Sequence, residues 1–368
     1  MSRCALIMAG GTGGHVFPAL ALAQELRLEG WRVVWLGTHA GIEARLIPEQ
    51  GYAFETISVG GLRGKGMLRA LLAPLMVLLA CAQSLMVLLR QRPDVVVGFG
   101  GFAAFPGGLT AALLMKPLIL HEQNAVAGLT NRLLARLARR VFEGFPKSFE
   151  APSTHPLARL VGVPRKVTWV GNPVRPEIRW LAAPARRFAG RSGVLQILVL
   201  GGSQGARALN TLIPQALALI PVEERPLVLH QGGDKMMDTL RQSYREQGVE
   251  GDLRPFIKDM AAAYAGCDLV ICRAGALTIA ELAAAGVGSI LVPFPAAVDD
   301  HQTANAQFLE SRGAARVIAQ SRLNPALLAQ WLQELTRPAL LEMAQAARAL
   351  AKPEATEDLA AACREIAQ

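Results

Sequence analysis

The first 145 residues alternate short apolar runs with longer stretches in which apolar residues recur at helical spacing. Five runs are continuously apolar, which is typical of strands buried on both faces of a parallel sheet; they cover residues 3–9, 31–37, 94–100, 116–122 and 139–145. Helical spacing predicts helices over residues 16–29, 102–115 and 128–138. Strands that alternate with helices in this way indicate parallel βαβ units.

The same pattern restarts in the second half of the chain. Residues 195–218 repeat the opening order of apolar strand, Gly-Gly turn and helix, and further strands are predicted within 225–233, 267–276 and 288–294. Two such halves predict an α/β fold of two doubly wound, Rossmann-like domains that face one another across a deep cleft. We place these domains at residues 1–175 and 176–352. We expect the last helix, about 353–368, to pack back on the first domain.

One apolar stretch, residues 67–90, approaches the length of about 20 residues that spans a bilayer. Pro74, Gln83 and Ser84 interrupt it, and basic residues flank it: Arg63, Lys65, Arg69, Arg90 and Arg92. An apolar helix with basic flanks favours peripheral contact with an anionic membrane leaflet, with one face in the core. An ordinary buried helix and a true membrane span are the alternatives.

Composition and charge narrow the class of protein. A chain of 368 residues with 52% hydrophobic and 18% charged residues is too long for one ordinary core and is not disordered. Residues 1–175 hold 19 Lys and Arg against 9 Asp and Glu, a net +10, and the remainder holds 19 against 20, a net −1. This bias suits anionic lipid, a phosphorylated substrate or nucleic acid. The low aromatic content of 5% argues against nucleic acid.

Two glycine turns follow predicted strands. The first, "GGTGGH" at residues 10–15, matches neither common nucleotide-binding motif. Four glycines nevertheless let backbone N–H groups approach an oxyanion, and the following helix adds its dipole. A tight structural connection is the alternative. The second turn, "GGSQGA" at residues 201–206, adds the hydroxyl of Ser203 at the start of a helix.

A third turn opens a helix at Gly275–Thr278, with Glu281 in its first turns. A helix N-terminus binds phosphate, and a carboxylate one turn later can accept hydrogen bonds from two ribose hydroxyls. The alternative is an acid favoured only by the helix dipole. Asp299 and Asp300 are adjacent, so their side chains diverge and no third ligand is evident. The five cysteines show no zinc spacing either. We therefore expect no metal and no cofactor.

Seven blocks in series carry a resemblance to a known family: "MAGGTGGHVFPALA", "GLRGKG", "HEQNAVAGLTNRLLA", "GNPVR", "LGGSQGARALN", "DMAAAYAGCDLVICRAGALTIAELAAAG" and "HQTANA". They run from residue 4 to about 360 in the family's order. The chain resembles the MurG family of peptidoglycan glycosyltransferases, which add N-acetylglucosamine to lipid I and so make lipid II. The resemblance implies the GT-B fold, in which the C-terminal domain holds most of the nucleotide sugar.

The resemblance also implies a set of site residues. The UDP-N-acetylglucosamine contacts would be Thr12, Gly13, Gly14, Asn124, Arg175, Ser203, Ile257, Ala276, Leu277, Thr278, Ile279, Ala280, Glu281 and Gln302. The N-terminal domain would bind the lipid acceptor at the cytoplasmic face of the bacterial inner membrane, as a peripheral protein. Other cell-wall synthesis proteins are further candidate partners. The chain departs from the family pattern at Phe102, where tyrosine is usual, in the longer segment 151–168, and at His301, where glutamine stands.

His15 is our candidate for the catalytic base. Transfer to a hydroxyl requires that the acceptor lose a proton, and histidine, with a pKa of about 6.5 when unperturbed, suits that role. The family reacts with inversion, which needs one base and no covalent nucleophile. The alternatives for His15 are a hydrogen-bond donor to the acceptor phosphate and a structural cap. His121 and Glu122 are rival bases, although His121 also fits a satisfied core histidine.

Three other functions remain open on the sequence. The same scaffold could glycosylate a different acceptor, such as a glycolipid or macrolide-like aglycone, although the basic first half favours a pyrophosphoryl lipid. A sugar-nucleotide epimerase would need UDP-N-acetylglucosamine and no lipid. A non-catalytic scaffold in a cell-wall complex would not need the glycine turns, Glu281 or His15.

Overall fold

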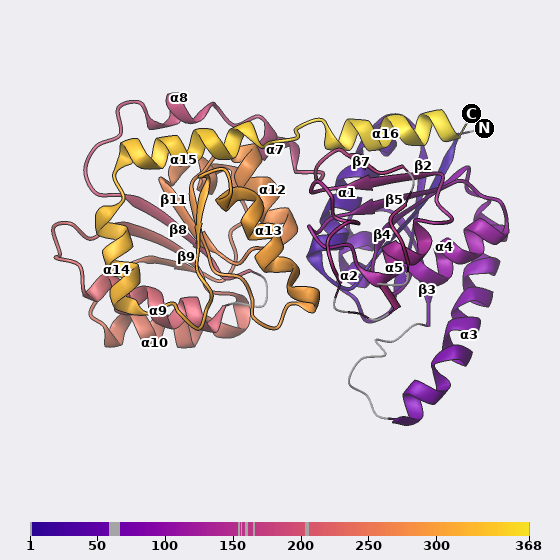
Figure 1. Ribbon diagram of the computed structural model, residues 1–368, viewed down its shortest axis with the longest axis horizontal. Coiled ribbons are helices and arrows are strands. Elements are labelled where there is room, and N and C mark those ends of the chain that lie inside the picture. The colour runs from indigo at the N-terminus through magenta and orange to yellow at the C-terminus, as the bar shows by residue number, and fades with distance from the viewer. Residues whose placement is uncertain are drawn as a thin grey trace. The chain divides into compact units, whose positions relative to one another are not determined.

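The computed structural model describes residues 2–58, 67–153, 155, 157–158, 161–164, 166–202 and 206–367. The side chains of residues 67–73 and of Val298 lie outside this description, as do "GLRGKG" and Ser203. The chain forms two compact units (Figure 1). Unit 1 comprises residues 1–174 and 352–368, and unit 2 comprises residues 175–351.

Unit 1 is built on a parallel sheet of seven strands in the order β3-β2-β1-β4-β5-β6-β7. The strands are β1 (Cys4–Ala9), β2 (Arg32–Thr38), β3 (Ala53–Ile57), β4 (Val95–Gly100), β5 (Leu118–Glu122), β6 (Arg140–Glu143) and β7 (Thr168–Trp169). The helices include α1 (Gly13–Leu28), α2 (Glu43–Glu49), α3 (Met67–Gln91), α4 (Ala104–Leu113), α5 (Leu129–Leu134) and α16 (Ala355–Ile366). All five strands predicted for this half are confirmed, whereas β3 and β7 were missed.

Strand β1 is buried on both faces of the sheet, which explains why its sequence is apolar at every position. Ala5 and Ile7 belong to the core layer that packs under α1 and α16, whereas Leu6 and Met8 belong to the layer under α3, α4 and α5. Side chains alternate between the two faces of a strand, so a strand covered on both faces must be apolar at every position. Helix α16 packs against α1, with Leu359 in the shared layer.

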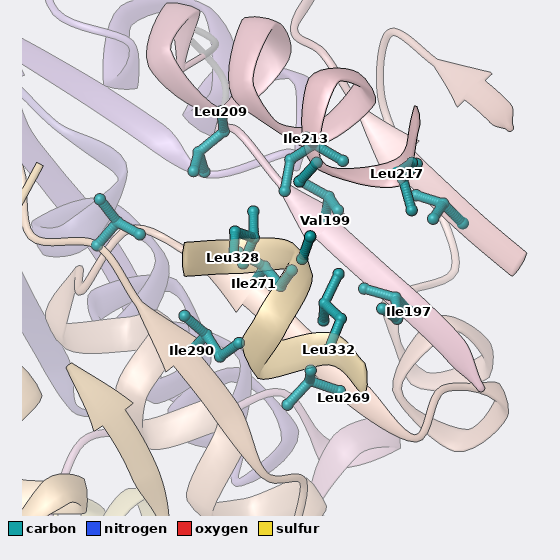
Figure 2. Packing of buried hydrophobic residues seen from close by; sticks show 14 of the residues in the cluster. Ile197, Val199, Leu209, Ile213, Leu217, Leu269, Ile271, Ile290, Leu328 and Leu332 are labelled. Carbon is teal, nitrogen blue, oxygen red and sulfur yellow. The ribbon is translucent and has the colours of Figure 1, made fainter. Parts of the chain in front are cut away.

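Unit 2 repeats the plan with six parallel strands in the order β10-β9-β8-β11-β12-β13. They are β8 (Gln196–Leu200), β9 (Leu227–Gln231), β10 (Asp252–Arg254), β11 (Leu269–Cys272), β12 (Ser289–Leu291) and β13 (Ala315–Val317). Its helices include α7 (Pro176–Arg179), α8 (Pro184–Phe188), α9 (Arg207–Ala218), α10 (Met237–Glu246), α11 (Met260–Gly266), α12 (Ala276–Ala285), α13 (His301–Glu310), α14 (Pro325–Glu334) and α15 (Arg337–Ala349). Figure 2 shows Val199 and Ile271 of the sheet packed with Ile213 of α9 and Leu328 of α14.

The two sheets have equivalent strand orders. In each sheet the order reverses at one point, where successive strands switch from one side of the first strand to its other side. In unit 1 the reversal lies between β1 and β4, and in unit 2 it lies between β8 and β11. In open α/β sheets, ligands bind beyond the carboxyl ends of the strands at this point. The first glycine turn follows β1, and the turn that opens α12 follows β11. The fold therefore places both turns where a ligand is expected.

Helix α3 has one buried face and one exposed face. Ala80, Ser84 and Leu88 are buried, and α3 packs against α4. Large apolar side chains point outward: Leu75, Leu78, Leu79, Met86 and Leu89 are all more than half exposed. The segment Pro74–Gln91 is long and apolar enough to cross a membrane, and 22% of it is buried. The alternative of an ordinary buried helix is therefore wrong.

Candidate active site

The glycine turn of unit 1 is a tight backbone connection between β1 and α1. Gly11 has φ +89°, a conformation that favours glycine. A Cβ atom on Gly101, which follows β4, would collide with the carbonyl oxygen of Gly10, so the two turns touch through their backbones. Gly13 and Gly14 begin α1, and their N–H groups have no acceptor within the helix, whereas the N–H of His15 donates to the carbonyl of Thr12 over 3.1 Å. This geometry suits an oxyanion-binding turn.

His15 lies in that first turn. Its Nδ1 is 3.1 Å from the hydroxyl of Thr12, the N-cap residue of α1. Its ring lies beside Gly100 at the end of β4, where an added Cβ would stand 3.2 Å from Nε2. The structure thus brings the sequence-predicted residues of this turn together at the point where the strand order reverses.

His121 is a core histidine. It is fully buried at the end of β5, and its Nε2 donates to the carbonyl of Gly171 over 2.8 Å. The side-chain amide of Gln123 lies 3.3 Å from its Nδ1. Burial lowers the pKa of His121 to about 4, so the ring is neutral near pH 7. These contacts fit the structural interpretation and not that of a rival base.

Glu122 is also held inside unit 1. Its carboxylate accepts from the backbone N–H of Asn124 at 2.9 Å and of Gly128 at 3.1 Å, and from the Nδ2 of Asn131 at 2.9 Å. The Nδ2 of Asn124 approaches the same carboxylate at 3.3 Å. Glu122 therefore fixes the loop that carries Asn124, one of the predicted sugar-nucleotide contacts.

In unit 2 the N-terminus of α12 is the counterpart of the glycine turn. Gly275 is its N-cap residue, and the first helical hydrogen bond runs from the N–H of Ile279 to the carbonyl of Gly275. The N–H groups of the preceding turn have no partner within the helix. Asn305 of α13 donates to the carbonyl of Ala274 over 3.1 Å and so fixes this end of β11. The six predicted residues Ala276–Glu281 all lie in α12.

The remaining predicted residues of unit 2 lie on other elements. Gln302 of α13 accepts from the backbone N–H of Phe294 over 2.9 Å. Ile257 follows β10 and its side chain is buried. Ser203 lies outside the described residues.

The carboxylate of Glu281 has hydrogen-bond partners within the protein that the sequence did not predict. Arg175 donates to Glu281 Oε1 from Nε at 3.2 Å and from Nη2 at 2.8 Å. The hydroxyl of Tyr264 donates to Oε2 over 3.1 Å. Burial raises the pKa of the Glu281 carboxyl, and Arg175 and Tyr264 oppose that shift. Of this pair, the Arg175 side chain is 43% exposed and that of Glu281 is 8% exposed, so Arg175 presents the accessible charge.

Sequence reasoning missed a second buried polar group in unit 2. His230 of β9 is fully buried, with Nδ1 3.1 Å from the Tyr244 hydroxyl and Nε2 3.2 Å from Oδ1 of Asn210. Asn210 donates in turn to the carbonyl of Gly232 over 3.1 Å. Burial lowers the pKa of His230 to about 3. These contacts fix the turn after β9, and only the tertiary fold reveals them.

Two further observations on the described residues bear on the place of the site. In the part of the chain that the structure describes, no group of three or more His, Cys, Asp and Glu side chains is placed to hold a metal ion. A hollow of about 940 Å³ is lined by Gln196, Leu227 and Asp252, which are the first residues of β8, β9 and β10. It lies at the opposite strand ends from the glycine turns, so we assign the site on the turns instead.

Comparisons with known proteins agree with this geometry. The model of the glycosyltransferase family 28 N-terminal domain matches residues 5–143, and that of the family 28 C-terminal domain matches residues 196–359. The crystal structure of Acinetobacter baumannii MurG is 39% identical, covers 99% of both chains and superimposes with a TM-score of 0.83. The chain belongs to the MurG family. This match confirms the family resemblance and the predicted GT-B fold.

Two other similar proteins differ in what they show about this chain, because one is close in sequence and the other is similar only in fold. A MurG-family relative from Azoarcus sp. (strain BH72) is 58% identical over 99% of this chain and 98% of its own length. It is named UDP-N-acetylglucosamine–N-acetylmuramyl-(pentapeptide) pyrophosphoryl-undecaprenol N-acetylglucosamine transferase. The calicheamicin glycosyltransferase CalG4 covers the whole chain with a TM-score of 0.63 at 17% identity. That second likeness shows the fold alone.

Proposed function

We propose that this chain is an inverting N-acetylglucosaminyltransferase. It moves N-acetylglucosamine from UDP-N-acetylglucosamine to the C4 hydroxyl of the N-acetylmuramyl group of lipid I and gives lipid II. The observation that carries this proposal is 58% identity over 99% of the chain to a transferase of that name. The glycine turn with His15 and the N-terminus of α12 supply chemistry that the reaction needs.

The chemical step is a single displacement. His15 takes the proton of the acceptor hydroxyl as its oxygen attacks the anomeric carbon of the sugar. The bond from that carbon to the β-phosphate oxygen breaks, and UDP leaves with the electron pair. The N-terminus of α12 and the exposed guanidinium of Arg175 offset the charge of the diphosphate. This arrangement of charge needs no metal ion.

Binding roles divide between the units in this proposal. Unit 2 binds UDP-N-acetylglucosamine through α12, Arg175, Ser203, Ile257 and Gln302. Unit 1 binds lipid I, and its turn at Thr12–Gly14, together with Asn124, contacts the sugar nucleotide. The net +10 charge of residues 1–175 suits a pyrophosphoryl acceptor.

The test is UDP release from UDP-N-acetylglucosamine in detergent with EDTA, with and without a lipid I analogue. We expect release that requires the analogue and persists in the chelator. UDP release without any acceptor would instead favour an epimerase or a hydrolase. Binding of UDP-N-acetylglucosamine without analogue-dependent release would keep the nucleotide site and reject lipid I as the acceptor.

We also propose that the protein is peripheral at the cytoplasmic face of the inner membrane and attaches through α3. The outward apolar side chains of α3 support this, and so do Leu113 and Met115 at the end of α4, which are 75% and 90% exposed. Helix α4 packs on α3, so the exposed apolar side chains occupy neighbouring elements. Basic residues around α3 suit an anionic leaflet.

The double variant Leu78→Glu, Met86→Glu tests this attachment. Both side chains are exposed, so the fold should tolerate the change. Loss of their insertion and added repulsion should lower binding to phosphatidylglycerol vesicles at least about tenfold. Sedimentation with vesicles measures this, and Leu219→Glu, an exposed leucine of unit 2, is the control. Unchanged vesicle binding in the double variant would reject α3 as the anchor.

A further inference from the structure

A buried carboxylate lies against the glycine turn of unit 1, and the proposed mechanism does not use it. Glu43, the first residue of α2, is completely buried. Its Oε2 accepts from the backbone N–H of Gly11 over 3.0 Å. Its Oε1 accepts from the backbone N–H of Thr38 at 3.1 Å and from the Thr38 hydroxyl at 2.8 Å. Glu43 therefore joins the end of β2 to the turn after β1.

Three glycines make room for this carboxylate. A Cβ atom on Gly10 would stand 2.5 Å from Oε1, and one on Gly37 would stand 2.7 Å from Cγ of Glu43. A Cβ on Gly41 would collide with Oε2. Glycine at these positions thus lets the backbone close around Glu43, which explains glycines that the turn itself does not require.

The donors around Glu43 suit a carboxylate and not an amide. Three N–H or O–H groups donate to its two oxygens, and an ionised carboxylate only accepts. A glutamine would turn its NH₂ group toward either the Gly11 N–H or the Thr38 N–H. Either the buried N–H of Thr38 or the partly buried N–H of Gly11 would then lose its acceptor, which is costly.

We propose that Glu43 is a positioning residue for the transfer reaction, a proposal that rests on the function assigned above. It fixes the N–H of Gly11 and with it the turn at φ +89°. Gly11 precedes Thr12, whose hydroxyl lies 3.1 Å from Nδ1 of His15. Glu43 thereby sets the place of the base and of the first N–H groups of α1 without touching substrate itself.

The test compares Glu43→Gln with a matched buried carboxylate in the same unit. Glu143 of β6 is 6% exposed and accepts from the backbone N–H groups of Lys147 at 2.8 Å and Ser148 at 2.9 Å. Strand β6 is three strands from β1 in the sheet, so Glu143→Gln removes a similar contact away from the turn. Both variants should lower the melting temperature, which makes stability the control.

The expected difference is catalytic. Small misplacement of a reacting group can cost up to about 10²-fold, so Glu43→Gln should lower kcat roughly 10- to 100-fold. Its Kd for UDP should change by less than about threefold, because most of the proposed nucleotide contacts lie in unit 2 and unit 1 supplies only those of Thr12–Gly14 and Asn124. Glu143→Gln should leave kcat within about twofold. A kcat for Glu43→Gln that equals that of Glu143→Gln would overturn the inference.

Variants of Thr38 keep the inference testable if Glu43→Gln folds poorly, and a double variant tests the route through His15 if it folds. Thr38→Val removes only the hydroxyl donor and should lower kcat several-fold, and Thr38→Ser should restore it. Glu43→Gln should add little to His15→Ala if Glu43 acts through His15, whereas multiplied effects would contradict that route. A wild-type protein without transfer to the lipid I analogue would reject the proposed function, a result distinct from failure of the Glu43 comparison.

Discussion

Replacement of His15 by alanine is expected to lower kcat by about 10²–10⁴-fold, which is the usual contribution of a positioned general base. In the tautomer in which Nδ1 donates to the Thr12 hydroxyl, 3.1 Å away, Nε2 is the nitrogen that takes the proton in this proposal. The Kd for UDP should change by less than about threefold, because α12 and Arg175 lie in unit 2. Single-turnover transfer to a lipid I analogue and calorimetry with UDP measure the two quantities.

His15→Gln separates the three roles that the sequence left open. Glutamine keeps a hydrogen-bond donor but cannot act as a base near neutral pH. If glutamine recovers most of the wild-type kcat, His15 is a donor to the acceptor phosphate and not the base. If both variants keep wild-type kcat and lose only thermal stability, His15 is a structural cap.

The sequence predicted the strands that lie deepest in each sheet. Strands such as β1 and β4 are covered on both faces, so burial forces continuous apolar runs that stand out in the pattern. The missed strands are β3, β7, β10 and β13. Strand β3 is only partly buried along most of its length, and the other three contain two or three residues, so none gives a continuous apolar run.

The sequence likewise predicted some parts of the candidate site and missed others. Glycine turns and helix starts are local, so the sequence located the turn at His15 and the start of α12. Partners distant in sequence were not predictable: Arg175 meets Glu281 across 106 positions, and Gly11 meets Glu43 across 32. No single sequence pattern joins such pairs, because only the tertiary fold brings them together. Tyr264 and Glu43 were missed for this reason.

In unit 2, Glu281→Gln is expected to weaken UDP binding about 10- to 100-fold. The carboxylate is our candidate acceptor for the ribose hydroxyls, and hydrogen bonds to a charged group contribute about 1.5–3 kcal/mol each. The glutamine also turns toward Arg175 either an NH₂ group or an amide oxygen, which is a weaker acceptor. In the wild-type protein Arg175 donates two hydrogen bonds to Oε1 of Glu281. Both changes act on the nucleotide, so calorimetry with UDP alone measures them without an acceptor.

The control for this variant is Glu177→Gln. Glu177 is an exposed carboxylate of α7 that also attracts Arg175, so its loss changes the charge near that guanidinium without removing the candidate ribose acceptor. We expect UDP binding within about twofold of wild type for Glu177→Gln. Tyr264→Phe removes the donor to Oε2 and should weaken binding only several-fold, because Arg175 still holds the carboxylate. Equal UDP affinity in Glu281→Gln and wild type would instead make Glu281 an internal partner of Arg175 and leave phosphate binding to the guanidinium and the N-terminus of α12.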